Sequence, residues 1–185
     1  MQNAFRTAIL GLSALTDRLA IVANAIGTLV VLLLVGVVNF DVVARGAFNA
    51  PFHGAIEVVQ FSMVLIVFLQ LPDVVRVNRL TRSDGFLVVV GQRLPRFSAL
   101  LRHVIDLMSA LFMALIAIAI WPEFVDMWHT QDYFGVPGVF TAPWWPIKLT
   151  IFVSAGLCTL IFALKVLLPA VKPARVRLPD HEADP

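Results

Sequence analysis

The sequence predicts an all-α integral membrane protein with four transmembrane helices, and three observations lead to this prediction. The chain of 185 residues is 59% hydrophobic and only 14% charged, with a mean hydropathy of +0.88. A soluble domain of this size would have too little polar surface to cover itself. Four apolar stretches are long enough to cross about 30 Å of hydrocarbon. The basic residues stand beside these stretches instead of following one soluble face.

The basic residues also predict the orientation of the chain in the membrane. Short loops rich in Lys and Arg stay on the cytoplasmic side. Six of the 14 basic residues lie in residues 76–102, between the second and third apolar stretches, and these are Arg76, Arg79, Arg82, Arg93, Arg96 and Arg102. Six more lie near the two chain ends, whereas Arg45 and Lys148 fall on the other side. We therefore expect both termini in the cytoplasm. The basic residues are expected to fix this topology and to attract anionic lipid head groups, and not to bind nucleic acid.

The first apolar stretch follows a mixed segment. Apolar residues recur at three and four over residues 1–19, which is typical of a short amphipathic helix on the membrane surface, and a frayed N-terminus is an equal alternative. The first span is predicted over residues 20–43. Asp41 and Arg45 near its far end are four apart and share a helix face, so they are expected to pair. We interpret the pair as an anchor at a helix end instead of a solute contact.

The second span is predicted over residues 55–75, after a turn at Asn49-Ala50-Pro51. Glu57 and Gln60 fall close together on this helix, whereas other polar residues gather on a roughly opposite side. Polar groups on two sides indicate more than one protein neighbour. In the arginine-rich loop that follows, the apolar run at residues 86–90 is too short to span, so we expect a surface-lying segment there.

The third span is predicted over residues 100–121. Arg102 and Asp106 are four apart at its basic end, and His103 stands beside them. These groups would suit a proton relay, but an ion pair next to an imidazole is the interpretation we favour. Residues 122–146 contain acidic residues, turn signals and most of the tryptophans, so they are expected outside, at the far interface.

The fourth span is predicted over residues 146–168. Thr150, Ser154 and Cys158 repeat every four residues, and small residues at this spacing let helix backbones approach closely. We expect residues 169–185 to form a disordered cytoplasmic tail. The membrane domain is therefore predicted over residues 20–168.

The sequence lacks the motifs of several function classes. It contains no Walker A loop, no Gly-x-Ser-x-Gly, no His-Glu-x-x-His and no cysteine pair, and its four histidines avoid the middle of the spans. We therefore expect no enzyme activity, no haem, no metal and no other cofactor. The charges also sit at span ends, whereas a solute carrier needs inward polar groups near its centre. The pattern indicates one part of a larger assembly.

Several short segments and single residues along the chain match the sequence pattern of one protein family. They are Asp41-Val-Val-Ala-Arg45-Gly-Ala-Phe48, Pro51, Gly54-Ala-Ile-Glu57, Phe68-Leu-Gln-Leu-Pro72, Ser83-Asp84, Gly138, Pro143-Trp144 and Pro146. Together they resemble the small, DctQ-like membrane subunit of the tripartite ATP-independent periplasmic (TRAP) transporters. The resemblance covers nearly the whole chain in length, span count and topology. One departure concerns the Gly-x-His-Ile-like element that the family often carries after the second span, because Asn78-Arg79-Leu80-Thr81-Arg82 stands there instead.

The resemblance implies a scaffold subunit in a bacterial inner-membrane importer of an organic acid, driven by an ion gradient. It implies two protein partners, a large permease subunit and a periplasmic solute-binding protein. On this interpretation Arg45, Glu57 and Gln60, with the packing face at Thr150 and Ser154, meet the large subunit. The loops around Asn49 and residues 131–138 face the binding protein. The alternative from another class is a four-helix anchor or electron-carrier subunit of a redox complex, in which His53 and His103 would approach a cofactor.

Overall fold

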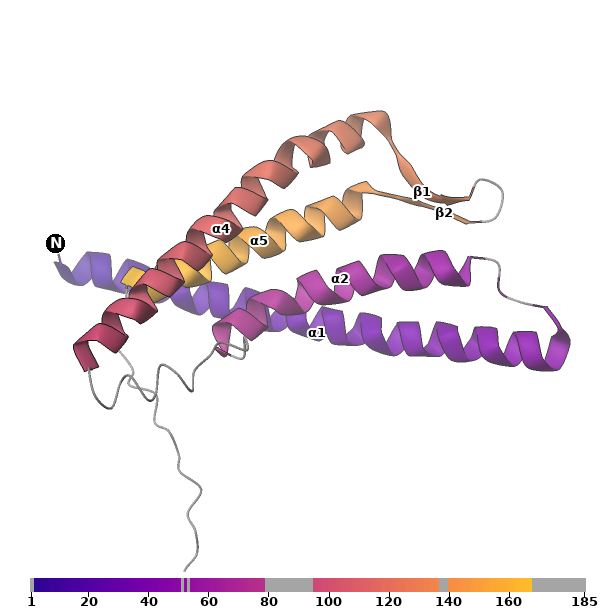
Figure 1. Cartoon of the computed structure of the whole chain (residues 1–185), viewed down its shortest axis with the longest axis horizontal. Helices are drawn as coiled ribbons and strands as arrows, with labels where there is room; N and C mark the ends of the chain where they lie inside the picture. The colour runs from indigo at the N-terminus through magenta and orange to yellow at the C-terminus, as the bar shows by residue number, and fades with distance from the viewer. Residues whose placement is uncertain (1, 51, 53, 79–94, 137–139, 168–185) are drawn as a thin grey trace, which may run out of the picture.

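The computed structural model describes residues 2–50, 52, 54–78, 95–136 and 140–167 (Figure 1). Its elements are α1 (Gln2–Phe48), α2 (Ala55–Arg76), α4 (Pro95–Thr130), β1 (Tyr133–Val136), β2 (Phe140–Pro143) and α5 (Trp145–Leu167). All four helices contain a stretch long and apolar enough to cross a membrane. The predicted fold class is therefore confirmed. The surface-lying segment expected at residues 86–90 and the tail predicted over residues 169–185 fall outside the described residues.

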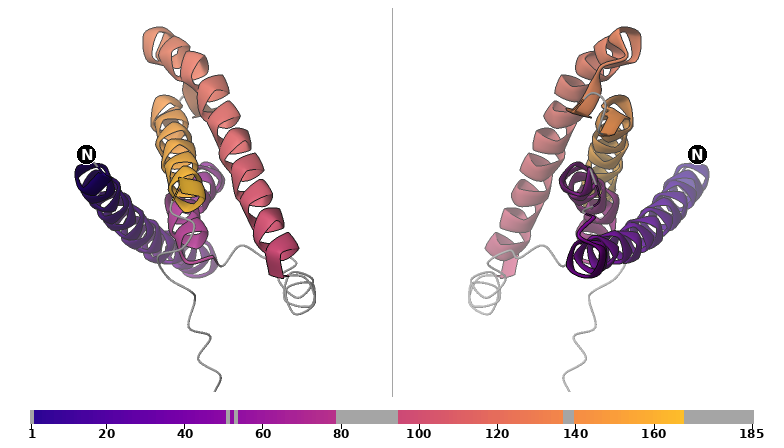
Figure 2. Two further views of the ribbon diagram at one scale, coloured as in Figure 1. Left: turned by 90° about the vertical axis from the view of Figure 1, so that its left-hand side faces the viewer. Right: turned by 90° about the vertical axis from the view of Figure 1, so that its right-hand side faces the viewer.

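The helices form two antiparallel pairs that meet along α2 and α5. α1 packs against α2, α4 packs against α5, and α2 contacts α5. We call the end of the bundle with β1 and β2 the strand end, and the end where α2 finishes and α4 begins the loop end. Figures 1 and 2 show that α2 and α5 lie close together near the loop end and move apart toward the strand end.

The first helix differs from the expected pair of segments, because residues 1–19 do not form a helix separate from the first span. One continuous helix of 47 residues runs from Gln2 to Phe48, and at 1.5 Å per residue it measures about 70 Å. Thr16 and Ala20, at the expected break, are 2% and 0% exposed. Their small side chains pack inside the bundle. The helix therefore continues through residues 16–20, where a surface helix was expected to meet the first span.

The third helix is also longer than the predicted span. It begins at Pro95 and continues past Pro122 to Thr130, instead of covering residues 100–121. A proline inside a helix removes one backbone hydrogen bond and usually bends or ends the helix, but membrane helices tolerate it when neighbours support the chain. The helix instead ends at Thr130, just before Gln131, whose φ of 54° lies in the left-handed region.

A small strand hairpin then connects α4 to α5, and the sequence pattern did not predict it. β1 and β2 are antiparallel, with Tyr133 opposite Pro143 and Val136 opposite Phe140. The Trp144 N–H donates a hydrogen bond of 3.1 Å to the Asp132 carbonyl, which closes the base of the hairpin. Within the described residues this hairpin is the one addition to an otherwise helical chain.

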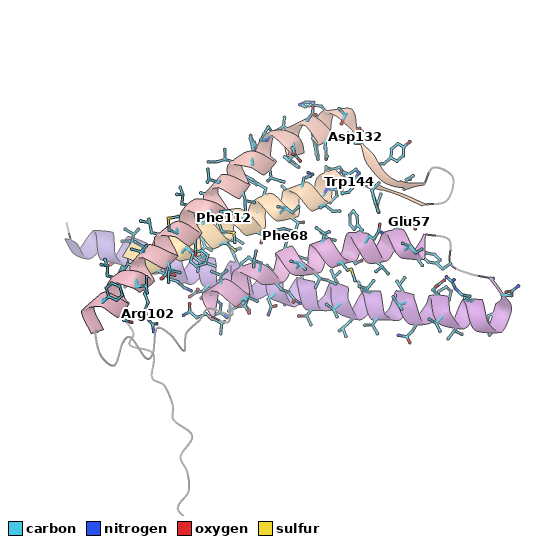
Figure 3. The ribbon with its side chains drawn as sticks, in the orientation of Figure 1. Glu57, Phe68, Arg102, Phe112, Asp132 and Trp144 are labelled. Carbon is cyan, nitrogen blue, oxygen red and sulfur yellow. The ribbon has the colours of Figure 1, made fainter. Side chains whose placement is uncertain are left out.

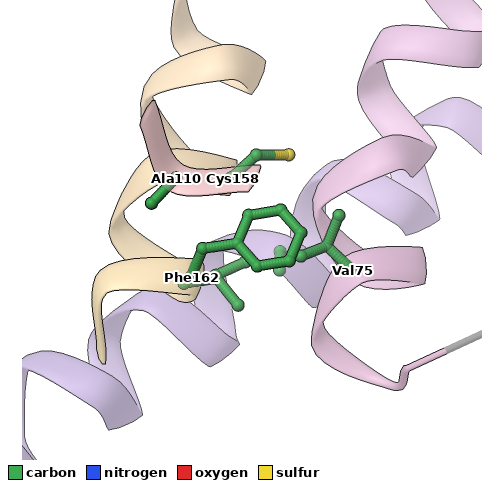
Figure 4. Close-up of a cluster of buried hydrophobic side chains, with 6 residues drawn as sticks. Val75, Ala110, Cys158 and Phe162 are labelled. Atoms are coloured by element: carbon green, nitrogen blue, oxygen red, sulfur yellow. The ribbon is translucent and has the colours of Figure 1, made fainter. Parts of the chain in front are cut away.

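The buried side chains gather toward the loop end. Ala20, Val75, Ala110, Cys158, Ile161 and Phe162 form one cluster to which all four helices contribute (Figure 4). Beside it, the Lys165 Nζ donates hydrogen bonds of 2.5 Å to the Val75 carbonyl and 2.6 Å to Asn78 Oδ1. Lys165 thus joins α5 to the C-terminal end of α2, where a helix favours positive charge.

Gly27 sets the distance between α1 and α2. A Cβ at this position would lie 2.8 Å from Gln70 Cγ and 3.2 Å from Leu69 Cβ, so a larger residue would overlap with α2. Close approach at a small residue is a common way for membrane helices to gain packing contacts. At Gly36, further along the same helix, a Cβ would meet nothing within 4 Å.

We expect Gly27→Val to lower the free energy of unfolding by about 1–3 kcal/mol, the usual effect of overpacking. Gly36→Val makes the same chemical change at an open position and should have almost no effect. Unfolding the purified chain in mixed micelles, followed by circular dichroism, measures both. Equal unfolding midpoints for the two variants would show that Gly27 does not set the helix spacing.

Candidate functional site

Asp41 and Arg45 lie together at the strand end of α1. Arg45 Nη2 is 2.9 Å from Asp41 Oδ2, and the Arg45 side chain is 62% exposed. The Phe52 N–H also donates a hydrogen bond of 2.8 Å to Asp41 Oδ1. Asp41 therefore holds the turn between α1 and α2, while the exposed guanidinium remains accessible to another protein or to a lipid head group.

Arg45 shares a shallow hollow with Gln60. The hollow has a volume of about 380 Å³ and lies between α1 and α2, with Asp41, Val59 and Ile56 also in its wall. The structure thus brings together Arg45 and Gln60, two of the five residues expected to meet the large subunit. Glu57 is half-buried near the beginning of α2 (Figure 3) and does not line this hollow. Within the described part of the chain, the Glu57 carboxylate has no hydrogen-bond or ion-pair partner.

Thr150 and Ser154 lie on the face of α5 that turns toward α2. Together they line a cleft of about 190 Å³ at the place where α2 and α5 begin to separate. Phe68 and Pro72 form part of the opposite wall, and Figure 3 shows Phe68 between the two helices. Ser154 and Cys158 of the predicted small-residue face are 3% and 0% exposed, and Thr150 is half-buried, so most of this face packs inside the bundle.

The strand end also holds contacts that no local sequence pattern predicted. Lys148 Nζ of α5 pairs with Glu123 Oε2 of α4 across 25 residues. Beside this pair, the rings of Trp121, Phe124, Trp128 and Trp145 follow one another with centroids 5.1–6.1 Å apart. Aromatic rings with polar atoms favour the membrane interface. The tryptophans of the sequence pointed to an interface, but no local pattern linked Lys148 to Glu123.

The arginine-rich loop and the basic end of α4 are described only in part. Arg76 pairs with Asp73 at 2.7 Å. Arg102 is exposed and Asp106 is half-buried on α4, and their mutual pairing stays a prediction. Arg96 belongs to the first turn of α4, and its side chain lies outside the described part. Arg79, Arg82 and Arg93 also lie outside the described residues.

The described residues contain no group of three or more His, Cys, Asp or Glu side chains placed to hold a metal ion. The cysteine at position 158 is buried inside the hydrophobic cluster. The features described above are surfaces between helices and at the strand end. They are suited to contact with other proteins and with lipid.

Comparison with known families gives one match. The family model described as the DctQ component of the tripartite ATP-independent periplasmic transporters matches residues 34–171. The match covers most of the chain and includes the last third of α1 and all of α2, α4 and α5. No curated protein and no solved structure matches the chain significantly.

Proposed function

This chain belongs to the DctQ family of TRAP transporter components, and from this premise we propose that it is the small, non-catalytic scaffold subunit of a TRAP-type importer. In this proposal it lies in the bacterial inner membrane. A large permease subunit carries the solute and the coupling ion, and a periplasmic solute-binding protein delivers an organic acid. The observation that supports the proposal most strongly is the family match over residues 34–171, which includes the end of the first span and the whole of the other three.

The geometry of the spans supports a scaffold role. Carriers that bind solute in the membrane usually use broken helices whose ends point at the ligand near the midplane. Each of the four described spans is a continuous helix. Several of the described charges lie near helix ends, as the Asp41–Arg45, Asp73–Arg76 and Glu123–Lys148 pairs show. The proposal therefore places solute movement in the large subunit.

The surface of the bundle also supports the proposal. Large apolar side chains are exposed along α1 and α4, and they include Leu29, Leu32, Leu33, Leu111, Phe112 and Ile118. In a membrane such faces meet lipid or another membrane protein. We assign the contact with the large subunit to Arg45, Glu57, Gln60, Thr150 and Ser154. The loops around Asn49 and residues 131–138 are assigned to the binding protein.

We propose that both chain termini and the arginine-rich loop face the cytoplasm, and labelling of engineered cysteines tests this. Cys158 is buried, so a membrane-impermeant maleimide should not reach it. Val90→Cys should stay unlabelled in intact cells and react after permeabilisation. Thr130→Cys, at the exposed end of α4, should react in intact cells. The reverse pattern would show that the chain has the opposite orientation.

Glu57→Lys should weaken binding to the large subunit about tenfold, because it replaces a half-buried carboxylate with a positive charge at the proposed contact. Asp126→Lys makes a comparable charge reversal on the exposed end of α4 and is the control. The measurement is recovery of the large subunit by affinity-tagged chain, with organic-acid uptake in cells carrying all three components. Full recovery and uptake with Glu57→Lys would remove Glu57 from the interface.

A further inference from the structure

The hollow between α1 and α2 at the strand end has both polar and apolar walls. Its volume is about 380 Å³. Arg45, Gln60 and Asp41 supply the polar groups. The rest of the lining is apolar, and it consists of Val38, Ala55, Ile56 and Val59. A lining of this kind suits a ligand that has a polar part joined to an apolar part.

The Arg45 guanidinium has N–H groups available for such a ligand. A guanidinium carries several N–H donors in one plane. Among the described residues Arg45 bonds only to Asp41, through Nη2 at 2.9 Å. The other Asp41 oxygen accepts the Phe52 N–H at 2.8 Å, so the turn fixes the carboxylate and the carboxylate fixes the arginine. The Gln60 amide is also exposed in the same wall.

The hollow lies at the depth of the lipid head groups. Arg76, whose pair with Asp73 marks the loop end of α2, and Ile56 of the hollow are separated by about 30 Å at 1.5 Å per residue. This distance equals the thickness of the hydrocarbon core. When Arg76 lies at one edge of the hydrocarbon, the hollow therefore lies at the other edge. The tryptophans of the strand end, which favour a membrane interface, lie at the same end of the bundle.

The apolar part of the hollow opens onto the outer surface of the helix pair. Val38 and Ile56 are 42% and 69% exposed, so the hollow is not closed by other parts of the described chain. Val35, one turn nearer the middle of α1, is also exposed and extends the apolar surface toward the centre of the membrane. An acyl chain that starts at the hollow can lie along these side chains.

The mixed lining distinguishes between the possible occupants. A carboxylate of another protein would bond to Arg45 but would leave the apolar wall uncovered. An uncharged lipid would cover the apolar wall but would leave the guanidinium without an anionic partner. A phospholipid does both, because its phosphate accepts charge-assisted hydrogen bonds from arginine and its acyl chains are apolar.

We propose that this hollow binds one phospholipid of the leaflet at the strand end, with its phosphate on the Arg45 guanidinium and the Gln60 amide and one acyl chain over Val38 and Ile56. The proposal goes beyond the proposed function, in which Arg45 and Gln60 contact the large subunit. A lipid held here would form part of that contact, between the two proteins.

Native mass spectrometry of the purified chain in detergent tests the site with defined lipids. The probes are a phosphatidylglycerol and a monogalactosyl diacylglycerol with the same acyl chains, because the second lipid lacks the phosphate. The chain should retain the phosphatidylglycerol about fivefold more strongly. Excess inorganic phosphate should not displace it, because the free ion has no acyl chain to cover the apolar wall.

Matched variants test the polar wall. Arg45→Gln removes the charge from the hollow, whereas Arg18→Gln makes the same change at an exposed position of α1 outside it. Arg45→Gln should lower phosphatidylglycerol retention about tenfold, and Arg18→Gln should change it less than about twofold. Gln60→Leu leaves the Asp41–Arg45 pair in place and should lower retention about threefold.

A second pair of variants tests the apolar wall. Val38→Phe fills the hollow, whereas Val43→Phe adds the same volume at an exposed position of α1 that does not line it. Val38→Phe should lower phosphatidylglycerol retention about fivefold, and Val43→Phe should leave it unchanged. Circular dichroism of each variant checks that the helices are intact.

Three results would overturn the inference. They are equal retention of the two lipids, equal retention by Arg45→Gln and Arg18→Gln, and release of the phospholipid when the large subunit binds. The last result would show that the large subunit itself fills the hollow. In each of these cases the chain would still bind the large subunit, and the proposed function would stand. Phospholipid retention by a chain that does not bind the large subunit would instead support the site and overturn the proposed function.

Discussion

Replacing Phe162 with alanine is expected to lower the free energy of unfolding by about 3 kcal/mol, because it opens a cavity in the cluster that all four helices share. Phe162 is 1% exposed and lies among residues of α1, α2, α4 and α5. Lipid is as apolar as this cluster, so the loss comes mainly from missing packing contacts instead of from hydrophobic transfer. Cys158 and Val75 are neighbours that would border the cavity (Figure 4).

Phe112→Ala is the matched control, because Phe112 is 64% exposed on α4. Truncation there removes little packing within the chain and should cost less than about 1 kcal/mol. Unfolding in mixed micelles with increasing dodecyl sulfate, followed by tryptophan fluorescence, measures both variants. Similar losses for Phe162→Ala and Phe112→Ala would mean that the helix pairs are not joined through this cluster.

The number of spans could be predicted from the sequence because it depends on local composition. A membrane helix needs about 20 apolar residues, and four such stretches stand apart in the chain. The segments around Asp41 and Glu57 also indicated the DctQ family, which the family match confirms. The Asp41–Arg45 contact could be predicted from local sequence too, because residues four apart on a helix share a face.

The ends of the helices were less predictable, because neighbouring elements decide them. The first span was predicted to begin at residue 20, after a mixed segment, but Asp17 and Arg18 just before it are exposed on the same continuous helix, in which Thr16 and Ala20 are buried. Pro122 likewise indicated an end, yet α4 continues beyond it beside α5. A polar residue inside an apolar stretch marks an exposed position as readily as a helix end.

Contacts between distant residues could not be predicted from local spacing. Lys148 and Glu123 are 25 residues apart, and Lys165 reaches Val75 across 90 residues. The cleft beside Ser154 depends on the angle between α2 and α5, and no repeating pattern in the sequence predicts this angle. The small-residue spacing on α5 indicated a packing face but not which helix packs against it.

The hydrogen bonds of Lys165 predict the second large effect. Lys165→Met keeps most of the side-chain volume but removes the donor to the Val75 carbonyl and to Asn78 Oδ1. Hydrogen bonds from a charged group contribute about 1.5–3 kcal/mol each, and nearby water at the loop end would replace part of this. We expect Lys165→Met to lower the free energy of unfolding by about 2–4 kcal/mol, because α5 loses both hydrogen bonds to the C-terminal end of α2.

Two further variants separate this role from a general effect of losing a lysine. Lys148→Met makes the same change at the other end of α5, where the partner Glu123 is 56% exposed, and should cost about 1 kcal/mol or less. Asn78→Ala removes one of the two acceptors of Lys165 and should fall between these values. Because Val75 also belongs to the Phe162 cluster, the double variant Lys165→Met with Phe162→Ala should lose less than the sum of the two single losses. If the losses in free energy of unfolding add exactly in the double variant, the Lys165 hydrogen bonds and the Phe162 cluster stabilise the contact between the helix pairs independently. If Lys165→Met and Lys148→Met lower the free energy of unfolding equally, the Phe162 cluster is the main contact between the helix pairs.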